Sequence, residues 1–466
     1  MVYSTPGVYV DEISTLPPSI VQASTAVPAF LGYTEKASNN GVANSLTLVP
    51  TRISNMLEFK QYFGGPQQAK FEITLADNAL RTITATTPVH KLYYALDLYF
   101  RNGGGSCYIV SVGDIGDPGT AKAKSNFSKG LLALAAEEEP TLLVMSEAAD
   151  LGTADEYYGL CQEALDHCSG FKNRFCILDV PQPAAGVTPE AEFTTFRGKV
   201  VKALKYGAAY FPHLLTSLSY EFTDKNVTFK DTRKNKNGND LNGKNLSILL
   251  AEGTADTGLY NAIKLELASP QYSVVLPPSP AIAGVYAAVD AERGVWKAPA
   301  NVALNGVIAP TVKITTEAQG KMNIDATSGK SINAIRAFSG KGIVVWGART
   351  LAGNDNEWRY ISVRRLFSMI EDSAMKATFF AVFEPNDATT WLKVKSMIES
   401  FLYSLWQQGA LAGPTQQAAY FVKVGLGSTM TSQDILEGRM IVEIGVAASR
   451  PAEFIILRFS HKLQEA

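Results

Sequence analysis

Short apolar runs separated by longer amphipathic stretches dominate residues 107–211. The runs are CYIVSV at 107–112, TLLVMS at 141–146, FCILDV at 175–180 and AAYF at 208–211. The stretches between them, near residues 121–138, 155–169 and 189–205, have the length and the 3.6-residue period of helices. Strands that are apolar throughout are typical of a parallel sheet covered on both faces. The pattern predicts an open α/β domain.

The last 110 or so residues predict two helices packed on a small sheet. Residues 361–376 place five apolar side chains on one helical face: Val363, Leu366, Phe367, Ile370 and Ala374. Residues 389–406 do the same with another five: Trp391, Val394, Ile398, Phe401 and Leu405. Asp387 is a possible N-cap of the second helix, and Gly409 can end it. Strand-like runs follow at 419–424, 440–446 and 453–459.

Two other regions lack a sustained period. Residues 221–245 are rich in Asn, Lys, Asp and Gly, which predicts an exposed insertion or long loop. Residues 276–350 are punctuated by Pro and Gly, as in LPPSPAIAG and WKAPAN. Such segments are typical of irregular chain between domains, so we expect a junction there.

The length and composition place these patterns in a multidomain globular protein. The chain has 466 residues, of which 46% are hydrophobic and 18% charged, enough to bury sizeable cores. We expect an N-terminal arm at 1–20 and a segment at 21–105 that packs partly with the C-terminal domain. After these we expect a central α/β domain at 106–350 that carries the insertion. It is followed by a C-terminal α+β domain at 351–448 and a terminal strand or arm at 449–466.

Charge and targeting signals narrow the classes of partner. Lys and Arg number 42 against 44 Asp and Glu, a balance without the positive field that nucleic acid or an anionic membrane surface requires. The opening MVYSTPGVYVDEI has no basic stretch followed by an apolar run, and no run of about 18 apolar residues occurs. We therefore expect no nucleic-acid partner, no membrane insertion and assembly in the cytoplasm.

The four cysteines predict buried, reduced thiols. They show neither CxxC spacing nor the density of a disulfide scaffold, and they fall in apolar or helical surroundings: Cys107, Cys161, Cys168 and Cys176. The few histidines add no metal site, because His167 beside Cys168 lacks the recurring spacing of zinc ligands. We predict no metal and no cofactor.

Nucleotide-binding and hydrolase motifs are incomplete. Gly329-Lys330-Ser331 is preceded by Ile324 where a phosphate loop needs its first glycine, and the GxG at Gly425 has Met430 where a dinucleotide motif needs its last. Asp179 and His213 both follow predicted strands, so a hydrolase pair is conceivable, but no serine lies in a GxSxG turn. We predict no catalytic residue and a structural role for both side chains.

Seven segments spread along almost the whole chain carry a further signal: TPGVYVDEI at 5–13, LPPSPAIAGVYAAVDAERGVWKAPAN at 276–301, INAIRAF at 332–338, VVWGARTL at 344–351, NEWRYISVRRL at 356–366, FEPND at 383–387 and RPAEFIILRF at 450–459. In this order they resemble the contractile tail sheath proteins of phages and related injection particles. Pro280 stands where such proteins often have glycine, and residues 447–450 lack the expected proline. These departures bear on which branch of the family the chain resembles, and not on the resemblance to the family itself.

The resemblance implies a structural subunit of a sheath built from stacked six-subunit rings around an inner tube. It also implies a central domain that resembles subtilisin in fold, as in some members, without catalysis. The implied partners are other copies, the tube protein, baseplate proteins and a terminator or cap. A subtilisin-like hydrolase is the alternative. Phage tail, bacteriocin, extracellular injection system and membrane-anchored machine all remain open.

The two termini are suited to link neighbouring subunits by exchanging strands. Residues 3–13 contain the β-formers Tyr3, Val8, Tyr9 and Val10, and Pro17 and Pro18 separate them from the rest. The second candidate set closes the chain: Glu453, Phe454, Ile455, Ile456, Leu457, Arg458 and Phe459. Each arm could add to a neighbour's sheet or pair within its own subunit.

Overall fold

The computed structural model describes residues 20–77, 81–116, 121–184, 186–234, 240–251 and 255–456, and this part of the chain forms two compact units. The smaller unit comprises residues 20–23 and Met369–Ser449, and the larger comprises the described residues of Ser24–Ser368 with residues 450–456. The chain thus passes between the units three times, once inside helix α9 (Ile361–Ala377). The boundary after residue 368 lies later than the expected one at 350.

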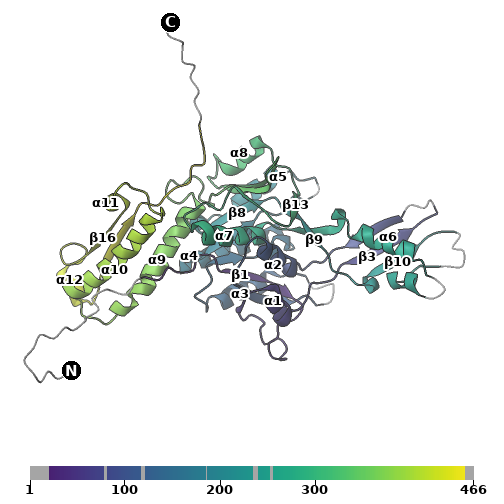
Figure 1. The fold of residues 1–466 in the computed structure, drawn as a ribbon, viewed down its shortest axis with the longest axis horizontal. Helices are drawn as coiled ribbons and strands as arrows, with labels where there is room; N and C mark the ends of the chain where they lie inside the picture. The colour runs from purple at the N-terminus through teal and green to yellow at the C-terminus, as the bar shows by residue number, and fades with distance from the viewer. Residues whose placement is uncertain are drawn as a thin grey trace, which may run out of the picture. The chain divides into compact units, whose positions relative to one another are not determined.

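A nine-stranded sheet forms the centre of the larger unit in the described part of the chain (Figure 1). Its strand order is β12 (Val302–Ala303), β15 (Gly342–Trp346), β14 (Ile332–Phe338), β8 (Gly207–Phe211), β7 (Phe175–Asp179), β6 (Leu142–Val144), β1 (Pro28–Thr34), β5 (Cys107–Asp114) and β2 (Thr51–Ile53). The strands from β14 to β5 run parallel, and β12, β15 and β2 are antiparallel to their neighbours. The predicted parallel sheet is confirmed.

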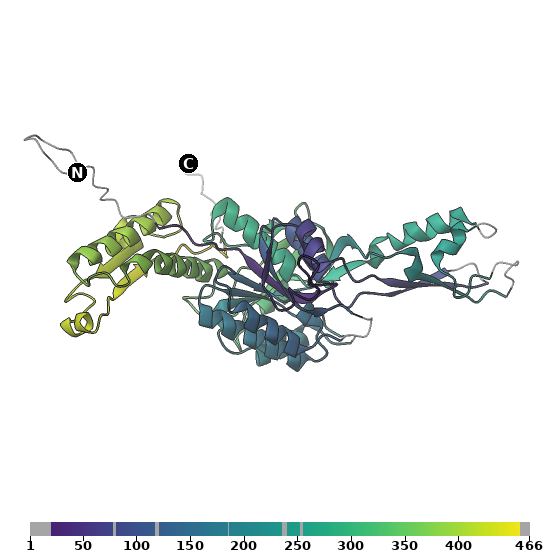
Figure 2. The same ribbon diagram turned by 90° about the horizontal axis from the view of Figure 1, so that it is seen from below.

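Helices cover both faces of this sheet (Figure 2). On one face, α1 (Met56–Phe63), α2 (Leu92–Arg101) and α7 (Ser279–Arg293) share a core with Phe30 of β1. On the other, α3 (Lys124–Leu134), α4 (Ala154–Phe171), α5 (Pro189–Lys199) and α8 (Thr316–Asn323) share a core with Ala29 and Leu31. Because successive strand residues point to opposite faces, both faces of an apolar strand are buried. The predicted helices α3, α4 and α5 are confirmed.

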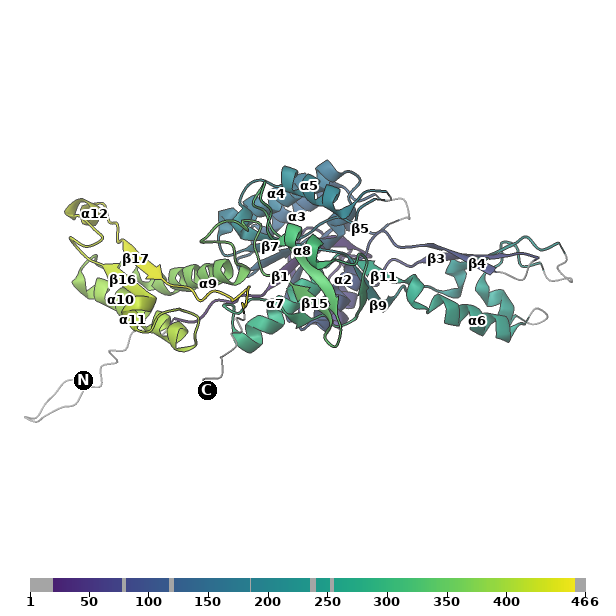
Figure 3. The same cartoon turned by 90° about the horizontal axis from the view of Figure 1, so that it is seen from above.

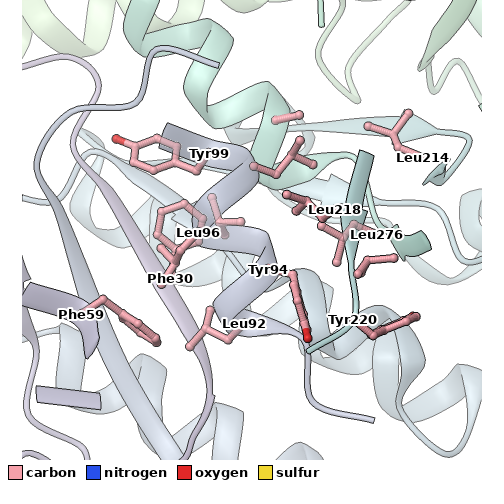
Figure 4. Packing of buried hydrophobic residues seen from close by; sticks show 14 of the residues in the cluster. Phe30, Phe59, Leu92, Tyr94, Leu96, Tyr99, Leu214, Leu218, Tyr220 and Leu276 are labelled. Carbon is pink, nitrogen blue, oxygen red and sulfur yellow. The ribbon is translucent and has the colours of Figure 1, made fainter. Parts of the chain in front are cut away.

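Aromatic packing joins α2 to the central strand. Phe30 and Tyr99 lie edge to face with ring centroids 5.0 Å apart, and Figure 4 shows them beside Leu96 in the same apolar cluster. Edge-to-face pairs of this kind are preferred by aromatic rings. The four cysteines are buried and free, as predicted.

Most of the N-terminal segment belongs to the larger unit, where strand β1 pairs with both β5 and β6 at the centre of the sheet. Its first residues, up to Ala23, belong to the smaller unit with the C-terminal residues, and the Ala23 amide donates to the Ser373 hydroxyl at 2.9 Å. About 70 residues separate β1 from β5 in the sequence, and that separation hides a pairing that local periodicity cannot reveal.

The region expected to be an irregular junction is also regular. It contains the end of β11 (Ser273–Leu276), the buried helix α7, β13 (Val307–Pro310) and three strands of the main sheet, β12, β14 and β15. Pro280 lies in the first turn of α7, where proline is compatible with a helix. Pro278 and Pro280 therefore mark a helix start and not irregular chain.

The polar insertion contains a strand, so the prediction of a long loop was wrong in part. Strand β10 (Val227–Asp231) pairs with β3 (Lys70–Leu75), which pairs in turn with β4 (Arg81–Thr86). Val227 and Phe229 are buried, and they were the only sign of a strand in a polar run. Figure 3 shows this sheet beside α6 (Thr257–Leu267), away from the main sheet. A third sheet joins β9 (Leu214–Ser219) to β11 and β13.

The smaller unit confirms the predicted helix pair and two of the three predicted strands. Helix α10 (Ala388–Gln407) starts at Asp387, whose carboxylate accepts a hydrogen bond from the Thr390 amide at 2.9 Å. Strands β16 (Tyr420–Val424) and β17 (Val442–Val446) pair antiparallel. The shorter elements are η6 (Thr378–Ala381), α11 (Gln416–Ala419) and α12 (Ser432–Leu436). Residues 453–456 form no strand, and 457–459 lie outside the described residues.

Two searches of the described residues concern membranes and metals. None of the helices there is both long and apolar enough to span a bilayer. The same residues contain no cluster of three potential His, Cys, Asp or Glu metal ligands.

Candidate functional site

Asp179 and His213 lie at the ends of neighbouring parallel strands, but they do not form a catalytic pair. The Asp179 carboxylate accepts hydrogen bonds from the Ser279 amide at 2.7 Å and from the Ser279 hydroxyl at 2.5 Å, at the first residue of α7. Among the described residues, no hydrogen bond joins His213 to the side chain of Asp179 or of Ser279. Ser279 is 0% exposed, so its hydroxyl is closed to a substrate. The arrangement is that of a buried helix cap.

Burial controls the titration of both groups. It raises the pKa of the Asp179 carboxyl to about 7, because the charged form loses its hydration. It lowers the pKa of the His213 imidazole to about 4 for the same reason. The incomplete phosphate motif is also occupied by the protein itself. Lys330 donates to the Arg197 carbonyl, and the Ser331 hydroxyl donates to the Asn323 carbonyl.

The smaller unit contains an apolar groove with a volume of about 710 Å³, which we call the β17 groove. Its lining comes from the end of α9, η6 and the following loop, α10, and β17 with the residues before it. These residues are Ala374, Met375, Thr378, Ala381, Val382, Phe383, Glu384, Pro385, Asn386, Thr390, Val394, Ile398, Gly438, Met440, Val442 and Ile444. The lining is predominantly apolar, as in interfaces that bind an apolar chain segment.

Strand β17 contributes two neighbouring side chains to the lining of this groove. Val442 and Ile444 lie two residues apart on one face of the strand, opposite Val424 and Val422 of β16. The lining includes residues of β17 and none of β16, so the groove borders β17. Among the described residues β17 pairs with β16 alone, which leaves its other edge with unpaired backbone groups.

Glu453 is bound within its own subunit, in the larger unit. Its carboxylate accepts hydrogen bonds from Arg349 Nε at 3.0 Å and Nη2 at 2.7 Å, from Asn323 Nδ2 at 2.6 Å and from the Tyr360 hydroxyl at 3.2 Å. The Arg349 side chain is 4% exposed. Burial alone would raise the pKa of Glu453, but the hydrogen bonds from Arg349 and Asn323 hold it below its usual value. We call these four residues the arm anchor.

The chain becomes exposed immediately after the arm anchor. Phe454 is 66% exposed and Ile455 and Ile456 are each 77% exposed, although all three are large apolar side chains. The remaining candidates, Leu457 to Phe459 and Tyr3, Val8, Tyr9 and Val10, lie outside the described residues. Strand exchange therefore stays a prediction.

Comparisons with known proteins agree with the fold. The family of the phage tail sheath protein central domain matches residues 204–351, and the phage tail sheath C-terminal domain matches residues 353–462. The subunit of the sheath complex of PVC, an extracellular contractile injection system in the contracted state, is 32% identical over 100% of this chain and 99% of its own, with a TM-score of 0.66.

The chain belongs to the contractile tail sheath family.

Other sheath proteins show the same similarity. The helical sheath of the anti-feeding prophage in the contracted state is 33% identical, with a TM-score of 0.65 over 99% of this chain and 100% of its own. The tail sheath protein of Vibrio phage KVP40 is 26% identical over 38% of this chain, and that of Enterobacteria phage T4 is 24% identical over 40%. This chain spans about a quarter of the length of those two relatives, 25% and 27%.

The family assigns the chain to structural sheath proteins of phage tails and tail-like injection systems. Sequence reasoning missed the β17 groove and the arm anchor, because their residues come from distant parts of the chain. Family-like segments did contain the signal: VVWGARTL holds Arg349, RPAEF holds Glu453 and FEPND holds Phe383.

Proposed function

We propose that this protein is the sheath subunit of a contractile particle and assembles as stacked six-subunit rings around an inner tube. The sheath is built in an extended, metastable state and contracts on a baseplate signal, which drives the tube through a target envelope. Support comes from the full-length similarity to sheath subunits whose own structures are described as contracted. Energy stored during assembly as a difference between two subunit packings requires no fuel site.

Strand exchange holds the subunits together in this proposal. The β17 groove takes residues 3–13 of a second copy, which add as a strand to the open edge of β17. Nineteen residues precede the described chain, enough to reach a neighbour. Val8 and Val10 are two residues apart, the same spacing as Val442 and Ile444, so they can enter the groove together.

The energy of one such link is modest, and repetition makes it effective. An added strand of this length gains several backbone hydrogen bonds, each worth about 0.5 to 1.5 kcal/mol net. Every subunit contributes an arm, so the links act multivalently across a ring and between rings. A connected lattice results from individually weak contacts.

The C-terminal segment is a second link. The arm anchor fixes the chain at Glu453, and the exposed apolar residues that follow are free of their own subunit's core. Phe454 to Phe459 are strongly apolar and favour extended structure, so they suit a neighbour's sheet.

The proposed role in a contractile particle implies further partners. They are the tube protein, baseplate proteins and a terminator or cap, with no nucleic acid and no inserted membrane segment. The subunit assembles in the bacterial cytoplasm and leaves as part of a virion or injection particle. Similar subunits occur in a baseplate of the anti-feeding prophage, which supports a baseplate contact.

Deletion of residues 1–18 tests the proposal. The shortened subunit should fold normally by circular dichroism, yet electron microscopy with tube protein present should show short rings or monomers and no extended sheath. Val10→Pro, which removes a strand hydrogen bond, should act in the same direction but more mildly. Val21→Ala, at an exposed position after the arm, is the control. Full-length contractile sheaths from the deleted form would contradict the proposal.

A further inference from the structure

Phe383 is an apolar side chain held in the open beside the β17 groove. It is 103% exposed, and its backbone has φ +68°, a left-handed conformation that bulky residues rarely adopt. Phe379 and Val382 on the same short segment are also exposed. We call residues 379–383 the aromatic lip. A strained, solvent-exposed aromatic residue is disfavoured in an isolated subunit, and such strain is typical of binding sites.

The loop that follows the aromatic lip fixes its position. The Asn386 amide group accepts a hydrogen bond from Trp391 Nε1 at 2.7 Å and donates one to the Arg439 carbonyl at 3.0 Å. Asp387 caps α10 one residue later. Backbone bonds from Val382 to Phe379 and from Glu384 to Ala381 close the turn on the other side. Phe383 is therefore presented by a braced loop, and its backbone is positioned before any partner arrives.

The aromatic lip borders the place where an arm would lie. Val382 and Phe383 line the β17 groove together with Val442 and Ile444. A strand added to the edge of β17 would have the side chains of Val442 and Ile444 on one side and the aromatic lip on the other. Buried aromatic side chains are the commonest anchors of protein interfaces.

We infer that Phe383 is the residue that retains the neighbour's arm, its ring packing onto the apolar side chains of residues 3–13 of a second copy. This inference rests on the proposed function and adds the element that selects the arm. The groove suits an extended partner with β-branched residues two positions apart, such as Val8 and Val10, because β-branched residues favour extended structure and this spacing matches that of Val442 and Ile444.

The test measures binding of a fluorescein-labelled peptide of residues 1–19 to the full-length protein by fluorescence anisotropy. Phe383→Ala should weaken binding at least tenfold, about 1.4 kcal/mol, with no change in melting temperature, because the ring is exposed in the free subunit. Asn386→Ala should weaken it less, by releasing the loop. Ile444→Arg should abolish binding by filling the groove with charge. Phe421→Ala, an exposed aromatic on β16 outside the groove lining, should bind as the unchanged protein does.

The outcomes separate the two ideas. Unchanged binding by Phe383→Ala, with binding still lost in Ile444→Arg, overturns the role of the aromatic lip and leaves the proposed docking intact. No binding to the unchanged protein, or full binding to Ile444→Arg, overturns both. Binding of a peptide of residues 452–466 to the groove, in place of residues 1–19, overturns the assignment of this groove to the N-terminal arm.

Discussion

At the residue scale, buried polar side chains hold the larger unit together at points where elements from distant parts of the chain meet. Asp179 ends β7 and caps α7, a hundred residues further on. The sequence could show that Asp179 follows a strand and that no serine lies in a GxSxG turn. It could not show Ser279 as the capped residue, because that contact depends on how α7 packs on the sheet.

Asp179 should make the stability of the protein fall as the pH rises. Its pKa is about 7 in the folded protein and about 3.9 in an unfolded chain, so between these values the folded state holds a proton that the unfolded state releases. The contribution of Asp179 to the free energy of unfolding is therefore fully present below about pH 4 and is lost as the pH rises to about 7. Asp179→Asn should flatten the slope of unfolding free energy between pH 5 and 7.

The measurement is urea unfolding at several pH values for both proteins. His213, whose pKa burial lowers to about 4, acts in the opposite direction but is common to the two proteins and cancels in the comparison. Equal slopes for the two proteins would show that Asp179 does not carry the pH dependence.

The arm anchor should respond asymmetrically to neutralisation of its two charges. Glu453→Gln leaves the Arg349 charge buried, and we expect a loss of about 3 kcal/mol. Arg349→Met leaves Glu453, which is partly exposed and can be hydrated, so its loss should be nearer 1 kcal/mol. The double variant should lose less than the sum, because neither charge is then left without its partner. Denaturant unfolding of the four proteins measures this, and additive losses would refute the coupling.

At the element scale, periodicity predicted the strands and helices that are continuous in the sequence. Helices α3, α4, α5, α9 and α10 and strands β5 to β8 followed from local pattern because each buries its own apolar face. Strands β1 and β10 escaped, since each joins its sheet through partners far along the chain. Helix α7 was hidden by prolines at its start. Non-local pairing and helix-start proline thus account for the errors.

The close contact of α2 with α7 should make Gly284 intolerant of a methyl group. A Cβ there would lie 2.6 Å from the Tyr99 carbonyl oxygen, a main-chain atom that cannot move aside cheaply. Gly284→Ala should therefore destabilise the protein by about 1 to 3 kcal/mol, although alanine is the better helix former. Gly170→Ala in α4, where a Cβ meets nothing within 4 Å, is the control and should stabilise by up to about 1 kcal/mol. A stabilising Gly284→Ala measured by thermal unfolding would contradict this packing.

At the scale of the whole molecule, the two proposed arms begin in different units of the chain. The residues just after the N-terminal arm belong to the smaller unit, where the Ala23 amide donates to the Ser373 hydroxyl. The C-terminal arm leaves the larger unit at the arm anchor. In the proposed lattice, links to neighbours would therefore engage both units of every subunit and could keep the subunits connected during contraction.

The sheath should have residues 356–466 and the N-terminal arm at its inner radius and the insertion at 221–245 outside. The family-like segments cluster in the former, while the latter is mostly polar, with Val227, Phe229 and Leu241 buried. Cryo-electron microscopy of sheath bound to tube measures the radius of each segment. Residues 221–245 found against the tube would reverse the assignment.

A reconstruction of the same sheath at side-chain resolution tests the central claim most directly, since it shows which chain occupies the edge of β17. The account predicts a strand beside Val442–Val446 that is continuous with Ile20 of a neighbouring subunit, with Val8 and Val10 facing the β17 groove and Phe383 packed on them. A strand continuous with Ile20 of the same subunit, or an edge of β17 left unpaired in the assembled sheath, would contradict it.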